Sequence, residues 1–133
     1  KEVKVLYIIH QKGAPRYKER IFAVKRADKG EGGDNILKQI TNADYVILLD
    51  ERGDKLTSEE FAGRVERWNL KGVKKVIFII GGAYGFSESL YKRADERISL
   101  SCMTFSHQMV RLIFLEQLYR AYTIVKGEPY HHK

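Results

Sequence analysis

Short apolar runs alternate with helical stripes along the chain, which is the pattern of an α/β fold. The segment 57–70 predicts a helix, because Thr57 and Glu60 form a capping box and apolar residues follow at helical spacing. It lies between two continuous apolar runs that suit central strands covered on both faces. This β–α–β unit predicts a parallel pair with a right-handed crossover. The predicted strands are 3–9, 45–49, 76–80 and a short one at 98–100.

Two further helices are predicted in the second half. Ser87 is a helix-capping residue before 87–96, and Gly127 ends a long helix over 106–126. The early part of the chain has a weaker pattern. There we expect a loop at 10–15, a helix at 17–28 and a loop at 29–33.

The last helix is apolar around most of its circumference, so it must be buried on more than one side. A small domain offers it one sheet, which predicts that a second subunit covers the rest in a two-fold homodimer. Glu116 and Arg120 lie four residues apart on it and can pair. One side of this helix carries Val110, Phe114, Leu118, Ala121 and Val125, and the rest carries Met109, Leu112, Ile113, Leu115, Tyr119 and Tyr122.

Composition adds limits to this picture. With 133 residues, 44% hydrophobic and 31% charged, the chain is expected to form a single domain, residues 1–133. Its one cysteine, Cys102, excludes an internal disulfide and is expected to be a small buried residue. The start lacks the pattern of a signal peptide, and the uncharged run 76–87 is too short to span a bilayer. We therefore expect a cytoplasmic protein with no membrane contact.

The net charge of +7 is unevenly distributed. Residues 1–33 hold nine Lys and Arg against four Asp and Glu, whereas 34–75 and 76–103 each balance. This basic end indicates either a surface that faces phosphate groups or a solvated loop.

Three predicted strands end in turn-forming residues: at 49–53, at 81–85 and at 99–105. If they share the carboxyl edge of one sheet, they form a pocket rich in backbone donors and acceptors. Such a pocket suits a flat heteroaromatic ligand. The glycines of 81–85 match neither a dinucleotide fingerprint nor a phosphate-binding loop, and a plain tight turn also explains them.

Other chemistry is weakly indicated. Ser101, Ser106 and His107 lack the nucleophile elbow of a hydrolase, and Ser106 is explained as a helix cap. His131 and His132 lack the ligand spacing of a metal site, so no metal is expected. The terminal Tyr-His-His-Lys is either a frayed end or a docked, reactive tail.

The segments IGGAYGF, LSCMTFSHQMVRLIFLEQLYRAYTI and GEPYHHK, with LLDERGDKLTSEEFA before them, resemble the small SPOUT-class RNA methyltransferases. The similarity is to the ribosomal large-subunit pseudouridine-N3 methyltransferases, and it runs in order from about residue 45 to residue 133. It implies a SPOUT-like α/β parallel-sheet domain with a C-terminal trefoil knot at about 76–133. It also implies a homodimer, S-adenosylmethionine as cofactor, and methylation of N3 of a pseudouridine in a stem-loop of large-subunit rRNA on the assembled ribosome.

The resemblance also implies the site. Leu49, Gly81 and the loop Leu100, Ser101, Cys102, Met103, Thr104 and Phe105 match the family's cofactor contacts. Tyr130 and His131 match the tail that reaches toward the active site, with His131 as candidate general base or proton relay and Tyr130 positioning the uracil ring. His107, Gln108, Glu116 and Arg120 match motif positions of less certain role.

The chain departs from the family at two places. Position 102 is usually Lys in relatives, and 12–34 is shorter than in most of them, through a reduced N-terminal half or omitted residues. Three alternatives remain: a SPOUT enzyme acting on transfer RNA, a non-catalytic ribosome-binding or assembly module, and a Rossmann-like nucleotide binder. The last lacks the acidic residue expected after its first strand.

Overall fold

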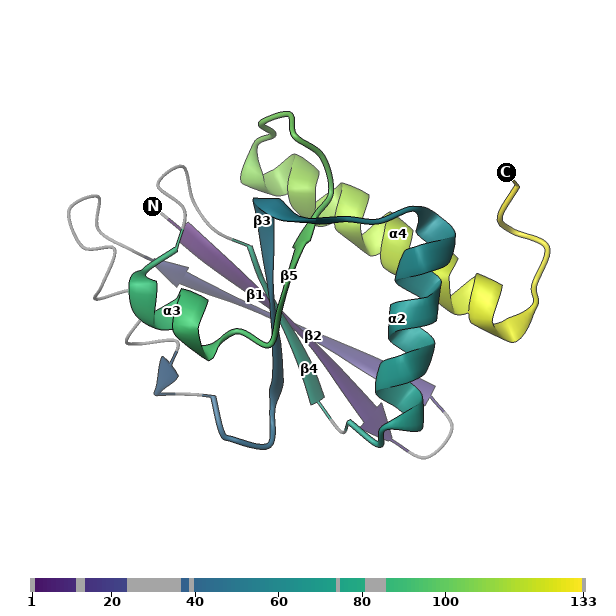
Figure 1. The fold of residues 1–133 in the computed structure, drawn as a ribbon, viewed down its shortest axis with the longest axis horizontal. Coiled ribbons are helices and arrows are strands. Elements are labelled where there is room, and N and C mark those ends of the chain that lie inside the picture. Colours follow the sequence, from purple (N-terminus) through teal and green to yellow (C-terminus); the bar gives the residue numbers. More distant parts are fainter. Residues whose placement is uncertain are drawn as a thin grey trace.

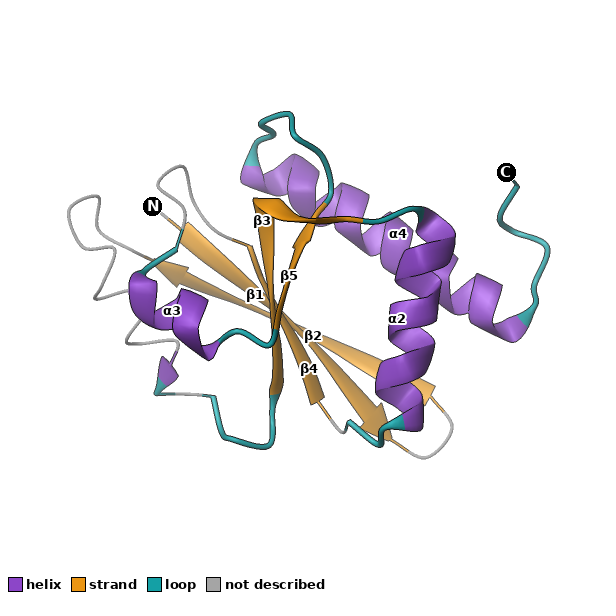
Figure 2. Cartoon of the chain, viewed as in Figure 1, coloured by secondary structure: helices purple, strands orange, loops and turns teal. Residues whose placement is uncertain are grey.

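The computed structural model describes residues 2–11, 14–23, 37–38, 40–73, 75–80 and 86–132, with the backbone alone described in the first two ranges and at His107. They form one five-stranded sheet with helices on both faces (Figures 1 and 2). The strands are β1 (Glu2–Gln11), β2 (Ala14–Ala23), β3 (Tyr45–Lys55), β4 (Lys75–Ile80) and β5 (Glu96–Ser99).

The order across the sheet is β2-β1-β4-β3-β5. β3 pairs in parallel with both β4 and β5, which confirms the parallel unit predicted from the sequence. β1 runs antiparallel to β4 and to β2. The sheet is therefore mixed, with a hairpin on one side.

The expectations for the early part of the chain were wrong where the structure describes it. Residues 17–23, expected in a helix, belong to β2. Of the loop expected at 10–15, residues 10–11 belong to β1 and residues 14–15 to β2. Lys, Arg and Glu favour helices in isolation, but pairing along β1 overrides that weak preference. Because β2 is an edge strand, charged side chains and an early proline are tolerated in it. Residues 29–33 lie outside the described part.

Local capping signals explain the helices. Helix α2 (Ser58–Leu70) begins with the predicted capping box, in which the Glu60 amide donates to Thr57 Oγ1 at 3.1 Å and the Thr57 amide donates to Glu60 Oε1 at 2.9 Å. Helix α3 (Glu88–Arg93) follows Ser87 and is shorter than predicted. Helix α4 (His107–Lys126) is capped by Ser106 and ends at Gly127, whose φ is 73°.

The period-two alternation of the strands divides the core between two faces. On one face α2 and α4 cover the sheet, and the rings of Trp68 and Phe114 lie 5.8 and 4.5 Å from that of Phe78. On the other face Ile77 and Ile79 pack toward α3. Figure 1 shows α3 on the opposite side of the sheet from α2 and α4.

Candidate active site

The three predicted loop-bearing strands end in a row. Ile80 of β4 pairs with Leu49 of β3, and Leu49 pairs with Ile98 of β5. Neighbouring strands lie about 4.8 Å apart, so the three ends fall within about 10 Å. The starts of these loops are therefore brought together at one edge, as expected. Gly81 and the rest of 81–85 lie outside the described residues.

A four-residue excursion leaves the sheet after Leu49. Both Leu49 and Asp54 pair with Ile98, so residues 50–53 stand outside the ladder. A Cβ at Gly53 would lie 2.6 Å from the carbonyl carbon of Arg97 and 2.7 Å from the amide nitrogen of Ile98. The lack of a side chain at Gly53 is what lets the excursion return against β5. The strand predicted at 45–49 ends earlier than the observed β3 (Tyr45–Lys55). The difference arises because the return pairs with β5, which is distant along the sequence.

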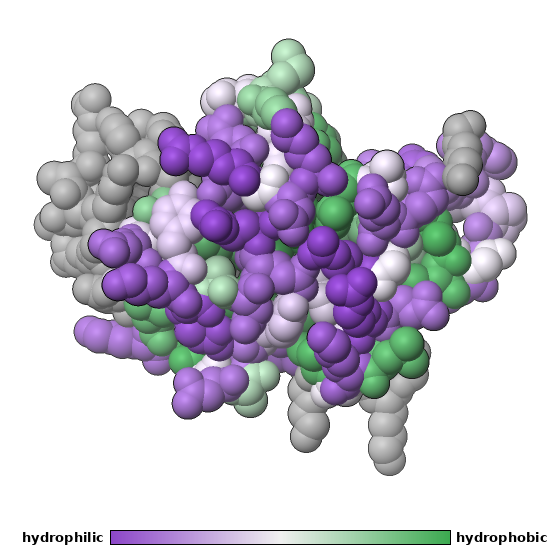
Figure 3. Space-filling model, in the orientation of Figure 1, coloured by the Kyte–Doolittle hydropathy of each residue, from purple (hydrophilic) through white to green (hydrophobic). Residues whose placement is uncertain are grey.

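The loop after β5 is short and turns on itself. Ser99 Oγ donates to the Ser101 carbonyl at 3.1 Å, and the Met103 amide donates to Ser101 Oγ at 3.0 Å. Leu100 packs against the core on the α2 and α4 face, as Leu49 does. The next side chains face outward: Met103 is 72% exposed and Phe105 36%. Figure 3 shows apolar residues at the surface over this loop, set among hydrophilic ones.

Cys102 is exposed, so the prediction of a small buried residue was wrong. It lies in the turn of a loop rather than in the core. Lys55, at the end of β3, lies beside it, and the hydrogen bond to Cys102 raises the pKa of the Lys55 ammonium. A cation is therefore present next to Cys102 in this loop.

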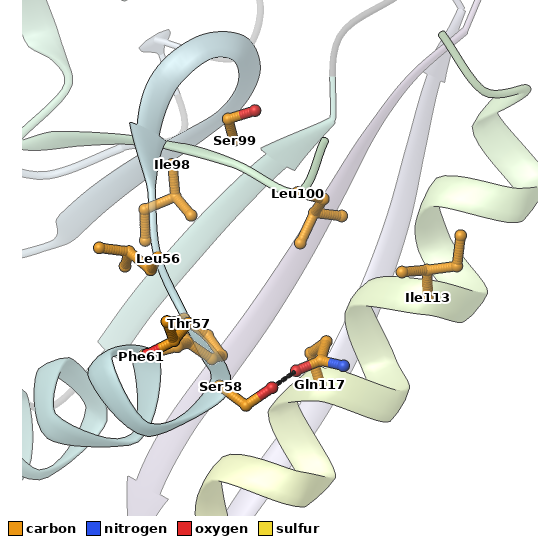
Figure 4. Close-up of a pocket in the computed structure, with 9 residues that line it drawn as sticks. All are labelled: Leu56, Thr57, Ser58, Phe61, Ile98, Ser99, Leu100, Ile113 and Gln117. Atoms are coloured by element: carbon orange, nitrogen blue, oxygen red, sulfur yellow. Dashed lines mark hydrogen bonds between the residues drawn. The ribbon is translucent and has the colours of Figure 1, made fainter. Parts of the chain in front are cut away.

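A pocket of about 300 Å³ opens between the end of β5, the start of α2 and α4. Its lining is divided about equally between apolar surface and polar surface, the latter including hydroxyl and amide groups. In Figure 4, Ser58 and Gln117 point toward each other across it, and Ser58 Oγ donates to Gln117 Oε1 at 2.7 Å. The lining residues are Leu56, Thr57, Ser58, Phe61, Ile98, Ser99, Leu100, Ile113 and Gln117.

A chain of polar contacts leads from this pocket along α4. Gln117 Nε2 donates to Glu116 Oε2 at 3.1 Å. Glu116 Oε1 accepts from Arg120 Nη2 at 2.7 Å and from Arg120 Nε at 3.0 Å. The pairing predicted between Glu116 and Arg120 is therefore present.

The C-terminal tail is docked against these polar side chains of α4 rather than frayed. Tyr130 packs edge-on against Tyr119, with ring centroids 4.9 Å apart, and its hydroxyl donates to Glu116 at 3.3 Å. His131 Nδ1 lies 3.0 Å from Arg120 Nη1, and its Nε2 lies 3.0 Å from Glu59 Oε1. The tail thus reaches the first turn of α2, next to the pocket residue Ser58.

Of the remaining motif residues, Gln108 is exposed in the first turn of α4, and the His107 side chain lies outside the description. Sequence reasoning missed Glu59 and Gln117 as members of the polar chain. No local signal could have found Glu59, since its partner is 72 positions away.

A second polar cluster joins α2 to the sheet. Glu96, at the start of β5, accepts from Trp68 Nε1 at 2.9 Å, from the Tyr45 hydroxyl and from Arg64. Arg64 also reaches Asp54 at 3.4 Å. Burial first, and then the hydrogen bond to Glu96, raise the pKa of Tyr45. This cluster holds together the strands that carry two of the loops.

The described residues contain no group of three or more His, Cys, Asp or Glu side chains placed to hold a metal ion. None of the helices described is long and apolar enough to cross a membrane.

Loops gathered at the carboxyl ends of three parallel strands, beside a pocket with a polar wall, define a ligand-binding α/β protein. The chain matches the family described as "Predicted SPOUT methyltransferase" over residues 2–131. It therefore belongs to the SPOUT methyltransferase family, as the resemblance indicated, and is a methyltransferase.

Its similar relatives carry one name, "Ribosomal RNA large subunit methyltransferase H". The protein of Christiangramia forsetii is 58% identical over 105 residues, which cover 79% of this chain and 67% of the relative. The protein of Parabacteroides distasonis is 53% identical, again over 105 residues that cover 79% of this chain and 67% of the relative. A Bacteroides fragilis relative is 48% identical over 119 residues, 90% of this chain and 76% of its own.

Proposed function

We propose that the protein transfers a methyl group from S-adenosylmethionine to N3 of a pseudouridine in a stem-loop of large-subunit rRNA, on the assembled ribosome in the cytoplasm. The family, the relatives' shared name and the order of motifs support this activity. The observation that carries it is the row formed by Ile80, Leu49 and Ile98, because it joins the roots of the three loops that carry the family's cofactor contacts.

The groups present at this edge fit the cofactor. The pocket beside Leu100, about 300 Å³, is at the lower end of the range for small-molecule sites. Residues 100–105 carry no formal charge, so backbone groups and apolar side chains would contact the adenine and methionine parts. Cofactor contacts are assigned to Leu49, Gly81, Leu100, Ser101, Cys102, Met103, Thr104 and Phe105.

When bound, S-adenosylmethionine supplies a methyl group on a positively charged sulfur that leaves as a neutral thioether. The chain must hold the uracil nitrogen in line with that methyl group and remove the N3 proton. His131 is assigned as the proton acceptor, a role worth roughly 10²–10⁴ in rate. For this, Arg120 must give up its contact with Nδ1 to the substrate. Tyr130, whose ring also faces the Arg120 guanidinium at 4.9 Å, is assigned to position the uracil ring.

The proposal includes a two-fold homodimer, which the outer face of α4 supports. Phe114, Leu118 and Ala121 are buried against the sheet, whereas Met109 and Leu112 are 47% and 61% exposed on the opposite side. An apolar stripe of this kind on a small domain suits a second copy of the chain. We include the trefoil knot at about 76–133 in this proposal on the family's support.

Calorimetric titration with S-adenosylmethionine tests the proposal first, and methylation of ribosomes deficient in the modification tests it second. Binding and transfer of one methyl group to a pseudouridine are expected. Absence of cofactor binding would favour a non-catalytic ribosome-binding module, and methylation of transfer RNA alone would favour a different SPOUT enzyme. His131→Ala, checked to be dimeric and able to bind cofactor, should transfer methyl groups slowly; a wild-type rate would exclude its role.

A further inference from the structure

Glu59 lies in the first turn of α2 and faces the C-terminal tail. Its Oε1 lies 3.0 Å from His131 Nε2, while Arg120 Nη1 lies 3.0 Å from His131 Nδ1 on the other side of the ring. The His131 imidazole is therefore held between a carboxylate of α2 and a guanidinium of α4. Its side chain is 17% exposed, which leaves it little freedom to turn.

The chemistry of the two partners assigns the ring's tautomer. A guanidinium can only donate hydrogen bonds, so Nδ1 must accept from Arg120 and carries no proton. In the neutral ring the proton is then on Nε2, which donates to the Glu59 carboxylate. Glu59 and Arg120 thus favour the same tautomer of His131, in which Nδ1 is the nitrogen able to take up a proton.

The carboxylate is itself held in place. The capping box fixes the start of α2, with Thr57 and Glu60 bonded to each other on either side of Glu59. The neighbouring Ser58 is bonded to Gln117 of α4, and Gln117 is bonded to Glu116. Through Arg120 and His131 the contacts return to Glu59, which closes a ring between the two helices. This rigid frame is what a positioning group requires.

We propose that Glu59 is a positioning residue for His131, which orients the imidazole with its proton on Nε2 and its acceptor nitrogen toward the position of Arg120. This inference rests on the proposed role of His131 in methyl transfer. Glu59 touches neither cofactor nor substrate in this role and acts through His131 alone. Its loss should therefore impair proton removal and leave cofactor binding intact.

The test compares Glu59→Ala and Glu59→Gln in the full chain, with Glu66→Ala as the matched control. Glu66 is an exposed glutamate on the same helix, and among the described residues it makes no hydrogen bond or ion pair. Each variant is measured for affinity for S-adenosylmethionine, for single-turnover methylation of ribosomes, and for nitrogen-15 spectra of the imidazole. The His131 signals are assigned by their loss in His131→Ala.

Glu59→Ala should slow single-turnover transfer by about 10- to 100-fold, as expected when a reacting group is misplaced by about 1 Å. Its cofactor affinity should equal that of the wild type, and the nitrogen-15 signals should lose the fixed Nε2–H form. Glu59→Gln should keep that form and most of the rate, because the amide oxygen still accepts from Nε2. Glu66→Ala should match the wild type.

Three results would overturn the inference: transfer at the wild-type rate by Glu59→Ala, equal loss of rate in Glu66→Ala, or loss of cofactor affinity along with rate. Failure of the proposed function is separate, since the wild type would then bind no cofactor or methylate nothing. In that case the spectra still decide whether Glu59 orients His131, because they need neither cofactor nor ribosome.

Discussion

Gly53 sets how closely the excursion after β3 approaches β5. Any side chain there would clash with the β5 backbone, because its Cβ would lie 2.6 Å from the Arg97 carbonyl carbon and 2.7 Å from the Ile98 nitrogen. By contrast, a Cβ at Gly63 in α2 would meet nothing within 4 Å. The two glycines therefore have opposite expected responses to the same substitution.

Gly53→Ala should lower the free energy of unfolding by about 1–3 kcal/mol, because backbone must move to admit the methyl group. Gly63→Ala should raise it by about 0.5–1 kcal/mol, since alanine favours a helix interior. Urea denaturation of both variants measures these changes. Equal effects would contradict the close approach at Gly53.

Tyr45 gives a pH-dependent prediction. Its pKa is raised above the unfolded value of about 10, so the native state holds the proton more tightly. The stabilisation is therefore complete below about pH 10 and is lost as pH rises beyond that value. Tyr45→Phe should be less stable by about 1–2 kcal/mol at neutral pH, through loss of a hydrogen bond to the Glu96 carboxylate.

The difference between wild type and Tyr45→Phe should shrink as the pH rises from about 9 to about 11. Taking the difference removes the titration of lysines that both proteins share. Denaturation at several pH values measures it, and a constant difference over that range would disprove the role of Tyr45.

Residues whose role is local could be predicted from the sequence. Thr57, Ser87, Ser106 and Gly127 all cap helices as expected. Gly53, Glu59 and Glu96 could not be assigned, because each is defined by a partner distant along the chain. Gly81 and the loop that it begins remain predictions.

At the scale of elements, α4 has two apolar faces with different partners. The inner face packs on the sheet, and Phe114 is fully buried there. The outer face exposes Met109, Leu112 and Tyr119, and the tail residue Tyr130 packs on part of it. The sequence predicted that one sheet could not bury this helix, and the exposed outer face agrees with that reasoning.

Leu112→Glu should convert the proposed dimer to a monomer, because a charge would be placed in an apolar interface. Leu70→Glu is the control, since Leu70 is 81% exposed at the end of α2 and away from α4. Light scattering after size-exclusion chromatography measures the mass. A wild-type monomer, or a Leu112→Glu variant that stays dimeric, would reject this interface.

The strands show which elements a pattern can place. Continuous apolar runs identified β3 and β4, because strands covered on both faces need such runs. The β1–β2 hairpin was missed, since an edge strand needs no apolar pattern and its charged residues resemble a helix.

At the scale of the whole molecule, the proposed function requires this domain to find one nucleotide in a ribosome. A single module of this kind buries about 600–1,000 Å² on a nucleic acid, which limits how much sequence it can read. The net charge of +7 supports attraction to RNA but not selection of a site. Under the proposed function, we expect recognition to come from the shape of the assembled particle.

We therefore expect fast methylation of assembled ribosomes and slow methylation of free large-subunit rRNA under the same salt conditions. Single-turnover rates with each substrate measure this contrast, and reactions without S-adenosylmethionine serve as the blank. Equal rates would contradict recognition of the assembled particle.

The four residues between Leu49 and Asp54 have a further consequence, because the strand pairing is the same on both sides of them. A longer or shorter segment there leaves the registration of β3 with β5 unaltered. Related chains can thus differ in length at this point without refolding the sheet. The same property makes the position after Glu51 a suitable place to insert a fluorescent label that reports on events at this edge of the sheet.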